Sequence, residues 1–283
     1  MRRRRHCVMN REKKLRVFSY PYVIWMAIFV IVPLLIMAYY GLTTKEGTFT
    51  LENIKSIAEP VHLKALWTAI QLSVICTAVC FLLALPLALV IRGLHIRSNG
   101  FIIFIFILPM WMNFLLRTIA WQSLLERTGV INAVLSFFGL PEQNMINTEG
   151  AIVLGMVYNY LPFMVLPIYN ALAKISQDTF DAAKDLGAGS WQTMRRITLP
   201  LIFPGIVSGS TMVFVPALTT FALSDLLGGA KIQLIGNVIE QSFTTANDWN
   251  LGAGLSFVLM ILVLVSMAVM SKYDKTGEGA GIW

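Results

Sequence analysis

Charged residues are scarce in this sequence. Asp, Glu, Lys and Arg make up 13% of its 283 residues, whereas hydrophobic residues make up 57% and the mean hydropathy is +0.70. Soluble domains carry about a quarter charged residues. The scarcity of charge therefore excludes an ordinary soluble domain and predicts an all-α polytopic membrane protein.

Histidine and cysteine are also rare, with three residues of each. The histidines are scattered among tails and loops: His6, His62 and His95. They offer no nucleophile–base arrangement of the kind that a membrane enzyme needs. Cys7 lies in a basic tail, and Cys76 and Cys80 share one helical face. That pattern favours small apolar packing residues over a thiol pair or a metal site.

No motif in the sequence would let it power transport by itself. It lacks the G-x-x-x-x-G-K-[ST] loop that cradles nucleotide phosphates. Its apolar segments lack the acidic or histidine series of a proton relay. The chain halves show no internal repeat, which disfavours an inverted-repeat secondary transporter. We therefore expect no cofactor on this chain, and energy from ATP on a separate cytoplasmic subunit. A secondary transporter or channel is the alternative, and it would need a charged residue facing a cavity within the membrane.

Long apolar runs are what the sequence has instead. A membrane-spanning helix needs about 20 apolar residues. Six segments meet this requirement: about 20–41, 66–92, 100–119, 150–172, 202–224 and 250–271. They form one domain, residues 20–283, after a basic tail of residues 1–19.

Positive charge predicts how these segments are oriented. Eight of the 22 Lys and Arg residues precede residue 17. With this tail in the cytoplasm, 16 of the 22 lie on the cytoplasmic side and six lie outside. The positive-inside rule thus predicts cytoplasmic N- and C-termini. The same location favours a topology and lipid-headgroup anchor over a nucleic-acid arm.

Two glycines, Gly205 and Gly209, are four residues apart in the fifth apolar segment. This spacing predicts a small-residue face for close contact with another helix. The partner helix belongs either to this chain or to a second protein.

One polar segment, residues 176–200, lies between the fourth and fifth apolar segments. Asp178 is the predicted N-cap of a first short helix, with Phe180, Ala183 and Leu186 on one face. Gly187 is predicted to end this helix in a turn that requires a positive φ.

A second short helix is predicted to follow. Ser190 is its expected N-cap, and Trp191, Met194 and Ile197 lie on one side. Two prolines, Pro200 and Pro204, are expected to break or redirect it, because proline lacks the backbone N–H that a helix needs.

This polar segment resembles the cytoplasmic EAA loop of ABC-importer permeases. That loop runs Glu-Ala-Ala, three residues, Gly, and about nine residues later Ile-x-Leu-Pro. The matching residues are Asp181, Ala182, Ala183, Gly187, Ile197, Leu199 and Pro200. The one departure is Asp181 for Glu, which keeps the charge and loses a methylene. The resemblance implies a type I ABC-importer permease fold of six transmembrane helices, with the first short helix docked in a cleft of an ATPase subunit.

Further stretches are similar to the spermidine/putrescine permeases of that family. They are LPMWMNFLLRT (108–118), YNYLPFMVLPIY (158–169), SDLLGGAKIQLIGN (224–237) and DWNLGAG (248–254). The resemblance implies import of a polyamine by alternating access in the bacterial cytoplasmic membrane. It also implies ATPase subunits, a second homologous permease and a periplasmic or lipoprotein substrate-binding protein as partners. A permease for another small substrate is the alternative, because related permeases share the fold.

A polyamine is a flexible polycation, so its path needs anionic acceptors and aromatic faces. The candidate residues are Asp225, Asp248, Trp249, Trp111, Tyr158 and Tyr160. The two aspartates flank the expected outer ends of the fifth and sixth apolar segments. As alternatives, Asp225 caps a helix or pairs with Lys231, and the aromatic residues face lipid or pack in the core.

Overall fold

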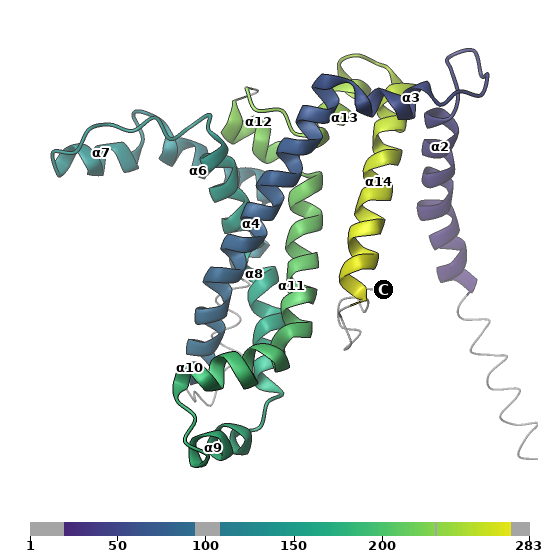
Figure 1. Ribbon diagram of the computed structural model, residues 1–283. Helices are drawn as coiled ribbons and strands as arrows, with labels where there is room; N and C mark the ends of the chain where they lie inside the picture. The colour runs from purple at the N-terminus through teal and green to yellow at the C-terminus, as the bar shows by residue number, and fades with distance from the viewer. Residues whose placement is uncertain (1–19, 94–107, 230, 273–283) are drawn as a thin grey trace, which may run out of the picture. The chain divides into compact units, whose positions relative to one another are not determined.

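Helices dominate the computed structural model, which describes residues 20–93, 108–229 and 231–272 (Figure 1). The described residues divide into two compact units. The larger one comes from Ala58–Gln241 with Met260–Trp283, and the smaller one from Met1–Ile57 with Ser242–Leu259. The all-α class predicted from the composition is confirmed.

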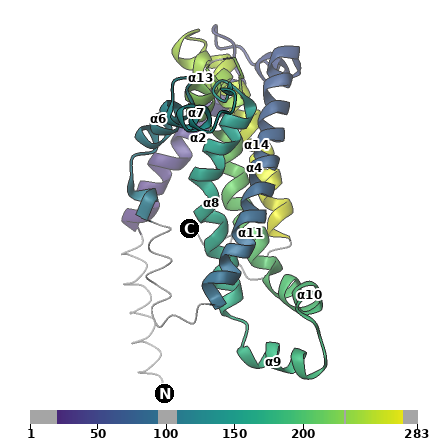
Figure 2. The same cartoon turned by 90° about the vertical axis from the view of Figure 1, so that its left-hand side faces the viewer.

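The larger unit is built on three long helices that pack side by side: α4 (Pro60–Gly93), α8 (Glu149–Ala173) and α11 (Leu199–Thr219) (Figures 1 and 2). The buried face of α4 is a stripe of small residues three or four apart: Ala65, Ala69, Ser73, Cys76, Cys80, Ala84 and Ala88. Small side chains let helix backbones approach closely. Both cysteines therefore occupy packing positions, as the sequence predicted.

The close contact between α8 and α11 depends on glycine. A Cβ at Gly205 would lie 2.7 Å from the carbonyl oxygen of Pro167 and 2.7 Å from the Cβ of Ala171. A Cβ at Gly209 would lie 2.8 Å from the Sδ of Met164. The small-residue face predicted at these glycines thus packs within the chain, against α8.

The helix that leads into α11 continues through Pro200 and Pro204, which were expected to break or redirect it, so the expected break is wrong. Residues Ser190–Thr219 form one helical run through α10 (Ser190–Thr193), the π-turn η4 (Met194–Thr198) and α11. Pro200 follows the π-turn directly, and the helix continues through it although proline lacks the backbone N–H of a helical hydrogen bond. The π-turn widens the helix just before it. Thr198 Oγ1 donates a hydrogen bond across this turn to the Thr193 carbonyl oxygen.

Short helices gather at the two ends of the larger unit (Figure 2). One end carries α9 (Gln177–Asp185) and α10, and is called the α9 end below. The opposite end carries α12 (Ala222–Gly228), α6 (Phe114–Leu125) and α7 (Val130–Phe137). The part of it from α12 to residue 241 is called the α12 end. Here Thr220 leaves helical geometry after α11, and the chain restarts as α12.

The third predicted apolar segment is only partly described. Residues 108–111 form the 3₁₀-turn η3 (Leu108–Trp111), and α6 starts at Phe114. Asn113 caps α6, because its side-chain oxygen accepts hydrogen bonds from the Leu115 and Leu116 N–H groups. Residues 100–107 of this segment lie outside the described residues.

The smaller unit contains η1 (Ala27–Ile31), α2 (Val32–Gly41) and α3 (Glu52–Lys55). The helices η2 (Ser56–Ala58), α13 (Ile235–Thr244) and α14 (Trp249–Ser271) each continue into the other unit. Two asparagine amides close the end of α2. The Asn250 amide donates to Tyr40 and Thr43, and the Asn53 amide donates to Gly41 and Thr43. These bonds satisfy carbonyls that a helix end leaves unpaired.

Five helical runs in the described residues are long and apolar enough to cross a membrane. They are Tyr20–Gly41, Pro60–Gly93, Glu149–Ala173, Ser190–Thr219 and Trp249–Ser271. The sixth predicted span, 100–119, depends on residues beyond the described ranges. The count of six spans therefore stays a prediction.

Candidate functional site

The predicted helix–glycine–helix lies at the α9 end. Gly187 has φ +76°, so the left-handed turn predicted there is confirmed. Its N–H donates to the Lys184 carbonyl over 2.8 Å, and the Ala188 N–H donates to the Ala183 carbonyl over 3.0 Å. This pair of bonds is the Schellman motif, which closes a helix on a residue without Cβ strain. The end of α9 is thus fixed by its own backbone.

The two predicted N-caps are each displaced. α9 begins after Ser176, and Asp178 lies in its first turn. The carboxylate there still favours the helix dipole. The second helix is capped at Gly189, whose N–H donates to the Gln192 side chain over 3.3 Å, and Ser190 is its first residue.

The surface of α9 and its following turn is unusual because large apolar side chains project from it. Leu186 is 89% exposed and Trp191 is 74% exposed. Ala183 is buried and Ala182 is exposed. Asp181 forms an ion pair with Lys184 one helical turn away, with 3.7 Å between Oδ1 and Nζ. This surface therefore combines exposed apolar side chains with an exposed ion pair.

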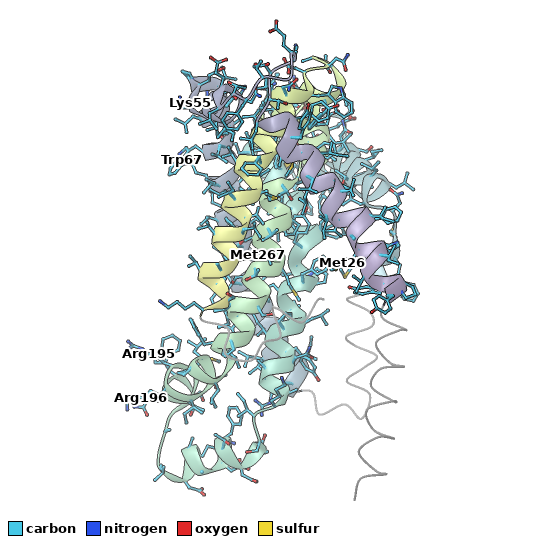
Figure 3. All side chains as sticks on the ribbon, turned by 90° about the vertical axis from the view of Figure 1, so that its right-hand side faces the viewer. Met26, Lys55, Trp67, Arg195, Arg196 and Met267 are labelled. Atoms are coloured by element: carbon cyan, nitrogen blue, oxygen red, sulfur yellow. The ribbon has the colours of Figure 1, made fainter. Side chains whose placement is uncertain are left out.

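The remaining residues of the EAA-like pattern lie in the helix that returns to the bundle. Ile197 is half-buried in the π-turn, Leu199 is half-buried at the start of α11, and Pro200 is exposed. Arg195 and Arg196 project from the same turn away from the bundle (Figure 3). The pattern therefore runs from α9, through the turn at Gly187, into the helical run Ser190–Thr219.

Arg92, in the last turn of α4, contacts this element in a way that the sequence did not reveal. Its Nη2 donates a hydrogen bond of 2.7 Å to the Ile175 carbonyl oxygen, just before α9. Its guanidinium also lies 4.3 Å from the ring centroid of Phe180 within α9. Sequence reasoning counted Arg92 only as a cytoplasmic positive charge. The sequence around Arg92 gives no indication of its contact with Phe180, which lies 88 positions away.

At the α12 end, a buried amide organises the polar groups. Asn237 Oδ1 accepts from the Ser224 hydroxyl over 2.7 Å and from the Leu234 N–H over 3.0 Å. Its Nδ2 donates to the Phe221 carbonyl over 3.1 Å and to Asp225 Oδ1 over 2.6 Å. Asn237 is 1% exposed, and these bonds use both sides of its amide. It fixes the Asp225 carboxylate in place.

Asp225 is exposed, and one oxygen of its carboxylate is bound to the buried Asn237 amide. Partial burial raises the pKa of Asp225 above its ordinary value, the charge of Glu240 raises it further, and the bond from Asn237 opposes the rise. In the described residues no ion pair joins Asp225 to Lys231, and Asn237 is the partner of Asp225 instead. Sequence reasoning missed Asn237, although the stretch 224–237 contains it.

Asp248 and Trp249 belong to the smaller unit. Asp248 accepts from the Leu251 N–H at the start of α14 over 3.1 Å, and it forms a 3.1 Å ion pair with Lys45. The Leu251 bond lowers the pKa of Asp248, the bond and charge of Lys45 lower it further, and partial burial opposes them. Trp249 Nε1 donates to Asn247 Oδ1, and its ring lies edge-on to Phe243 at 5.5 Å.

The aromatic candidates differ in environment. Trp111 is 75% exposed in η3. Tyr160 is buried, and its hydroxyl donates to the Pro216 carbonyl over 3.4 Å, so it joins α8 to α11. Tyr158 stacks edge-on with Trp121 at 5.3 Å, and the buried Arg117 guanidinium lies 5.7 Å from its ring. A cation already faces Tyr158, which disfavours a second one there.

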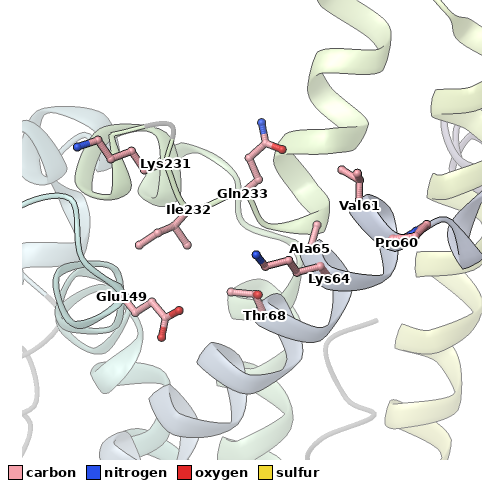
Figure 4. Close-up of a pocket in the computed structure, with 9 residues that line it drawn as sticks. All are labelled: Pro60, Val61, Lys64, Ala65, Thr68, Glu149, Lys231, Ile232 and Gln233. Carbon is pink, nitrogen blue, oxygen red and sulfur yellow. The ribbon is translucent and has the colours of Figure 1, made fainter.

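A cavity of about 540 Å³ opens in the larger unit between α4, the start of α8 and the segment after α12 (Figure 4). Its charged lining residues are Lys64, Lys231 and Glu149. Two ammonium groups outweigh one carboxylate, so the cavity is not complementary to a polycation.

The sequence and the fold together define the class of protein. The chain matches, over residues 7–275, the family described as binding-protein-dependent transport system inner membrane components. It belongs to that family, so it is a membrane permease and not an enzyme.

Two curated relatives resemble this chain over most of its length. The chain is 34% identical over 259 residues to the spermidine/putrescine transport system permease protein PotB of Haemophilus influenzae, covering 89% of this chain and 91% of that protein. It is equally similar to PotB of Escherichia coli, covering 94% of that protein. The inner membrane ABC transporter permease protein YdcU of Escherichia coli is 27% identical over 88% of this chain and 86% of its own length.

Solved structures agree on the fold. A chain of a bacterial ABC transporter involved in the import of the acidic polysaccharide alginate has a TM-score of 0.78 at 20% identity, covering 96% of this chain and all of that one. A chain of the MetNI methionine ABC transporter has a TM-score of 0.54 at 18% identity, covering 77% and 97%. The ABC-importer permease fold that the EAA-like segment implied is confirmed.

Proposed function

We propose that this chain is the transmembrane permease of an ATP-driven polyamine importer that accepts spermidine or putrescine. The observation that carries the proposal is the 34% identity to the PotB permeases over 89% of the chain. The similarity extends along nearly the whole of both proteins, so it is not confined to a shared loop. The runner-up is a permease for another small substrate, supported by the fold shared with an alginate importer.

The α9 end is proposed to dock on a separate ATPase subunit. Leu186 and Trp191 are exposed apolar residues that a partner surface would cover, and the burial of each would favour association by about 2 kcal/mol. The EAA-like residues Asp181, Ala182, Ala183 and Gly187 shape the first helix, and Ile197, Leu199 and Pro200 carry its movement into α11. ATP would drive alternating access only by binding one state of the complex better than the other.

The complete importer is proposed to contain a second homologous permease, two ATPase subunits and a periplasmic or lipoprotein substrate-binding protein. The chain is proposed to cross the membrane six times with both termini in the cytoplasm. On this orientation α9 faces the cytoplasm and α12 faces outward. Single cysteines at Lys184 and Lys231, with the native cysteines removed, test this with an impermeant thiol reagent on intact cells. Labelling at 231 and protection at 184 are expected, and labelling at 184 from outside would overturn the orientation.

The substrate path is proposed to include Asp225 as an anionic acceptor, with Trp111 as an exposed aromatic face. Trp249 belongs to the smaller unit, where its indole N–H bonds to Asn247 and its ring meets Phe243, so it is a weaker candidate. Asp248, Tyr158 and Tyr160 remain weaker candidates, because each already has a structural partner. A bound ammonium group would stabilise the charged form of Asp225, whose pKa partial burial raises, since a nearby cation favours the ionised carboxylate.

The test is transport by the whole complex. The chain is co-expressed with its partner permease, ATPase and binding protein, purified through a tag on this chain, and reconstituted in proteoliposomes. ATP-dependent accumulation of labelled spermidine, competed by putrescine and not by an anionic oligosaccharide, is expected. Purification without an ATPase would overturn the importer, and transport of another solute alone would overturn only the polyamine assignment.

A further inference from the structure

Arg92 joins the end of α4 to the α9 end through two contacts that require its planar side chain. The Nη2 hydrogen bond to the Ile175 carbonyl measures 2.7 Å, and the guanidinium lies 4.3 Å from the Phe180 ring centroid. One group lies just before α9 and the other lies within it. Arg92 therefore spans the link between α8 and α9 from a third helix.

The direction of this side chain is informative. An arginine in the last turn of a helix ordinarily reaches its own terminal carbonyls or the lipid headgroups. Arg92 instead reaches a separate segment, and it is only partly exposed there. A guanidinium can donate a hydrogen bond from its edge while its face covers an aromatic ring. A lysine ammonium is a point charge and cannot hold both contacts in this geometry.

We propose that Arg92 is the positioning residue that transmits movement of α9 to α4. This inference rests on the proposed role of α9 as the segment that docks on the ATPase. When α9 moves, the Arg92–Phe180 contact moves the end of α4 with it. The small-residue stripe of α4 packs tightly against α8 and α11, so the movement passes into the bundle as one piece. Without Arg92 the ATPase would still bind and hydrolyse ATP, while α4 would lag behind.

The experiment compares Arg92→Lys, Phe180→Leu and the double variant in the reconstituted complex. Arg92→Lys keeps the positive charge that orients the chain and removes the planar contact. Arg196→Lys is the matched control, because Arg196 is an exposed arginine at the same end (Figure 3). Three quantities are measured: ATPase subunit bound per permease, ATP hydrolysed, and substrate transported per ATP.

Each single variant is expected to bind the ATPase and to hydrolyse ATP within about twofold of the wild type, while transport per ATP falls about tenfold. The double variant is expected to be no worse than Arg92→Lys, because Phe180→Leu removes one of the two contacts that Arg92→Lys removes. Transport per ATP at the wild-type value in Arg92→Lys, or losses that multiply in the double variant, would overturn the proposal.

If Arg92→Lys does not accumulate in the membrane, Phe180→Leu tests the same contact, because this variant leaves Arg92 in place. If the wild-type complex carries a solute other than a polyamine, transport per ATP is measured with that solute. A wrong polyamine assignment is thereby separated from a failure of the Arg92 contact. Absence of a bound ATPase in the wild type would overturn both.

Discussion

The two ends of the larger unit differ in whether their side chains find partners within the chain. At the α12 end the polar groups satisfy one another, because Asn237 bonds to Ser224, Asp225 and the neighbouring backbone. At the α9 end the backbone is closed by the Schellman motif at Gly187, while Leu186 and Trp191 project into solvent. The polar groups of the first end bond to one another within the chain, whereas the second end leaves two large apolar side chains exposed.

This difference predicts which property a substitution at each end should change. A change at the α9 end should leave the fold intact and weaken energy coupling, because few contacts within the chain depend on its exposed surface. A change at the α12 end should first weaken the fold, because a buried network is left partly unsatisfied. The following predictions test this contrast, from the largest expected effect to the smallest.

Gly187→Val is expected to lower ATP-driven uptake about a hundredfold, because a β-branched residue at φ +76° costs about 2–3 kcal/mol in strain or lost docking. Insertion and abundance should stay near the wild-type level. Gly189→Val is the matched control, since Gly189 has φ −69° and nothing lies within 4 Å of its Cβ position. Uptake by both variants is measured in the reconstituted complex, and equal rates for the two would contradict the coupling role of this turn.

Asn237→Leu is expected to lower the free energy of unfolding by about 3 kcal/mol, because Ser224, Leu234 and Asp225 all lose a buried partner. Thermal unfolding of the purified protein in detergent measures it. Gln233→Leu removes an exposed amide nearby and should change stability by less than about 0.5 kcal/mol. A melting temperature unchanged in Asn237→Leu would show that the network does not hold this end together.

Much of the α9 end was predictable because its signals are local. The spacing of Ala183 and Gly187 sets a helix and its end within a few residues, and glycine alone tolerates the required φ without strain. The small-residue pair Gly205 and Gly209 likewise indicated a close contact, although only the structure showed that α8 is the partner.

The features that sequence reasoning missed all depend on contacts between distant segments or on small changes of helix geometry. Arg92 meets Phe180 across 88 residues, and Asn237 reaches back to Phe221. The π-turn Met194–Thr198 carries the helix past Pro200, where the local rule for proline predicted a break.

Asp225→Asn tests the α12 end without breaking its network, because an amide can still accept the bond from Asn237. Spermidine uptake is expected to fall several-fold while ATPase binding is unchanged. The raised pKa of Asp225 means that its protonated form favours the fold below the ordinary carboxyl value of 3.8, and this stability is lost as pH rises through the raised pKa. The Asn variant should lack that loss in thermal unfolding. Unchanged uptake would leave Asp225 with a structural role only.

Asp248 in the smaller unit should show the opposite pH dependence and the smallest effect. The Leu251 N–H and Lys45 lower its pKa, so its contribution to stability is present above 3.8 and is lost as pH falls through the lowered pKa. Asp248→Asn keeps an acceptor for Leu251 and loses the ion pair, of which Lys45 is largely exposed, so it should cost no more than about 0.5–1 kcal/mol at neutral pH. The cost should disappear in acid, where the wild-type carboxylate is protonated too.

Thermal unfolding of the wild type and of Asp248→Asn, at neutral pH and in acid, measures this difference in stability. The pKa of Asp225 is raised and that of Asp248 is lowered. One pH series on the two variants therefore separates a carboxylate whose pKa partial burial raises from one that the Leu251 N–H and Lys45 stabilise in its charged form. Stability changes of the same sign in both series would show that the two aspartates share one environment, which would contradict the opposite directions of their pKa shifts.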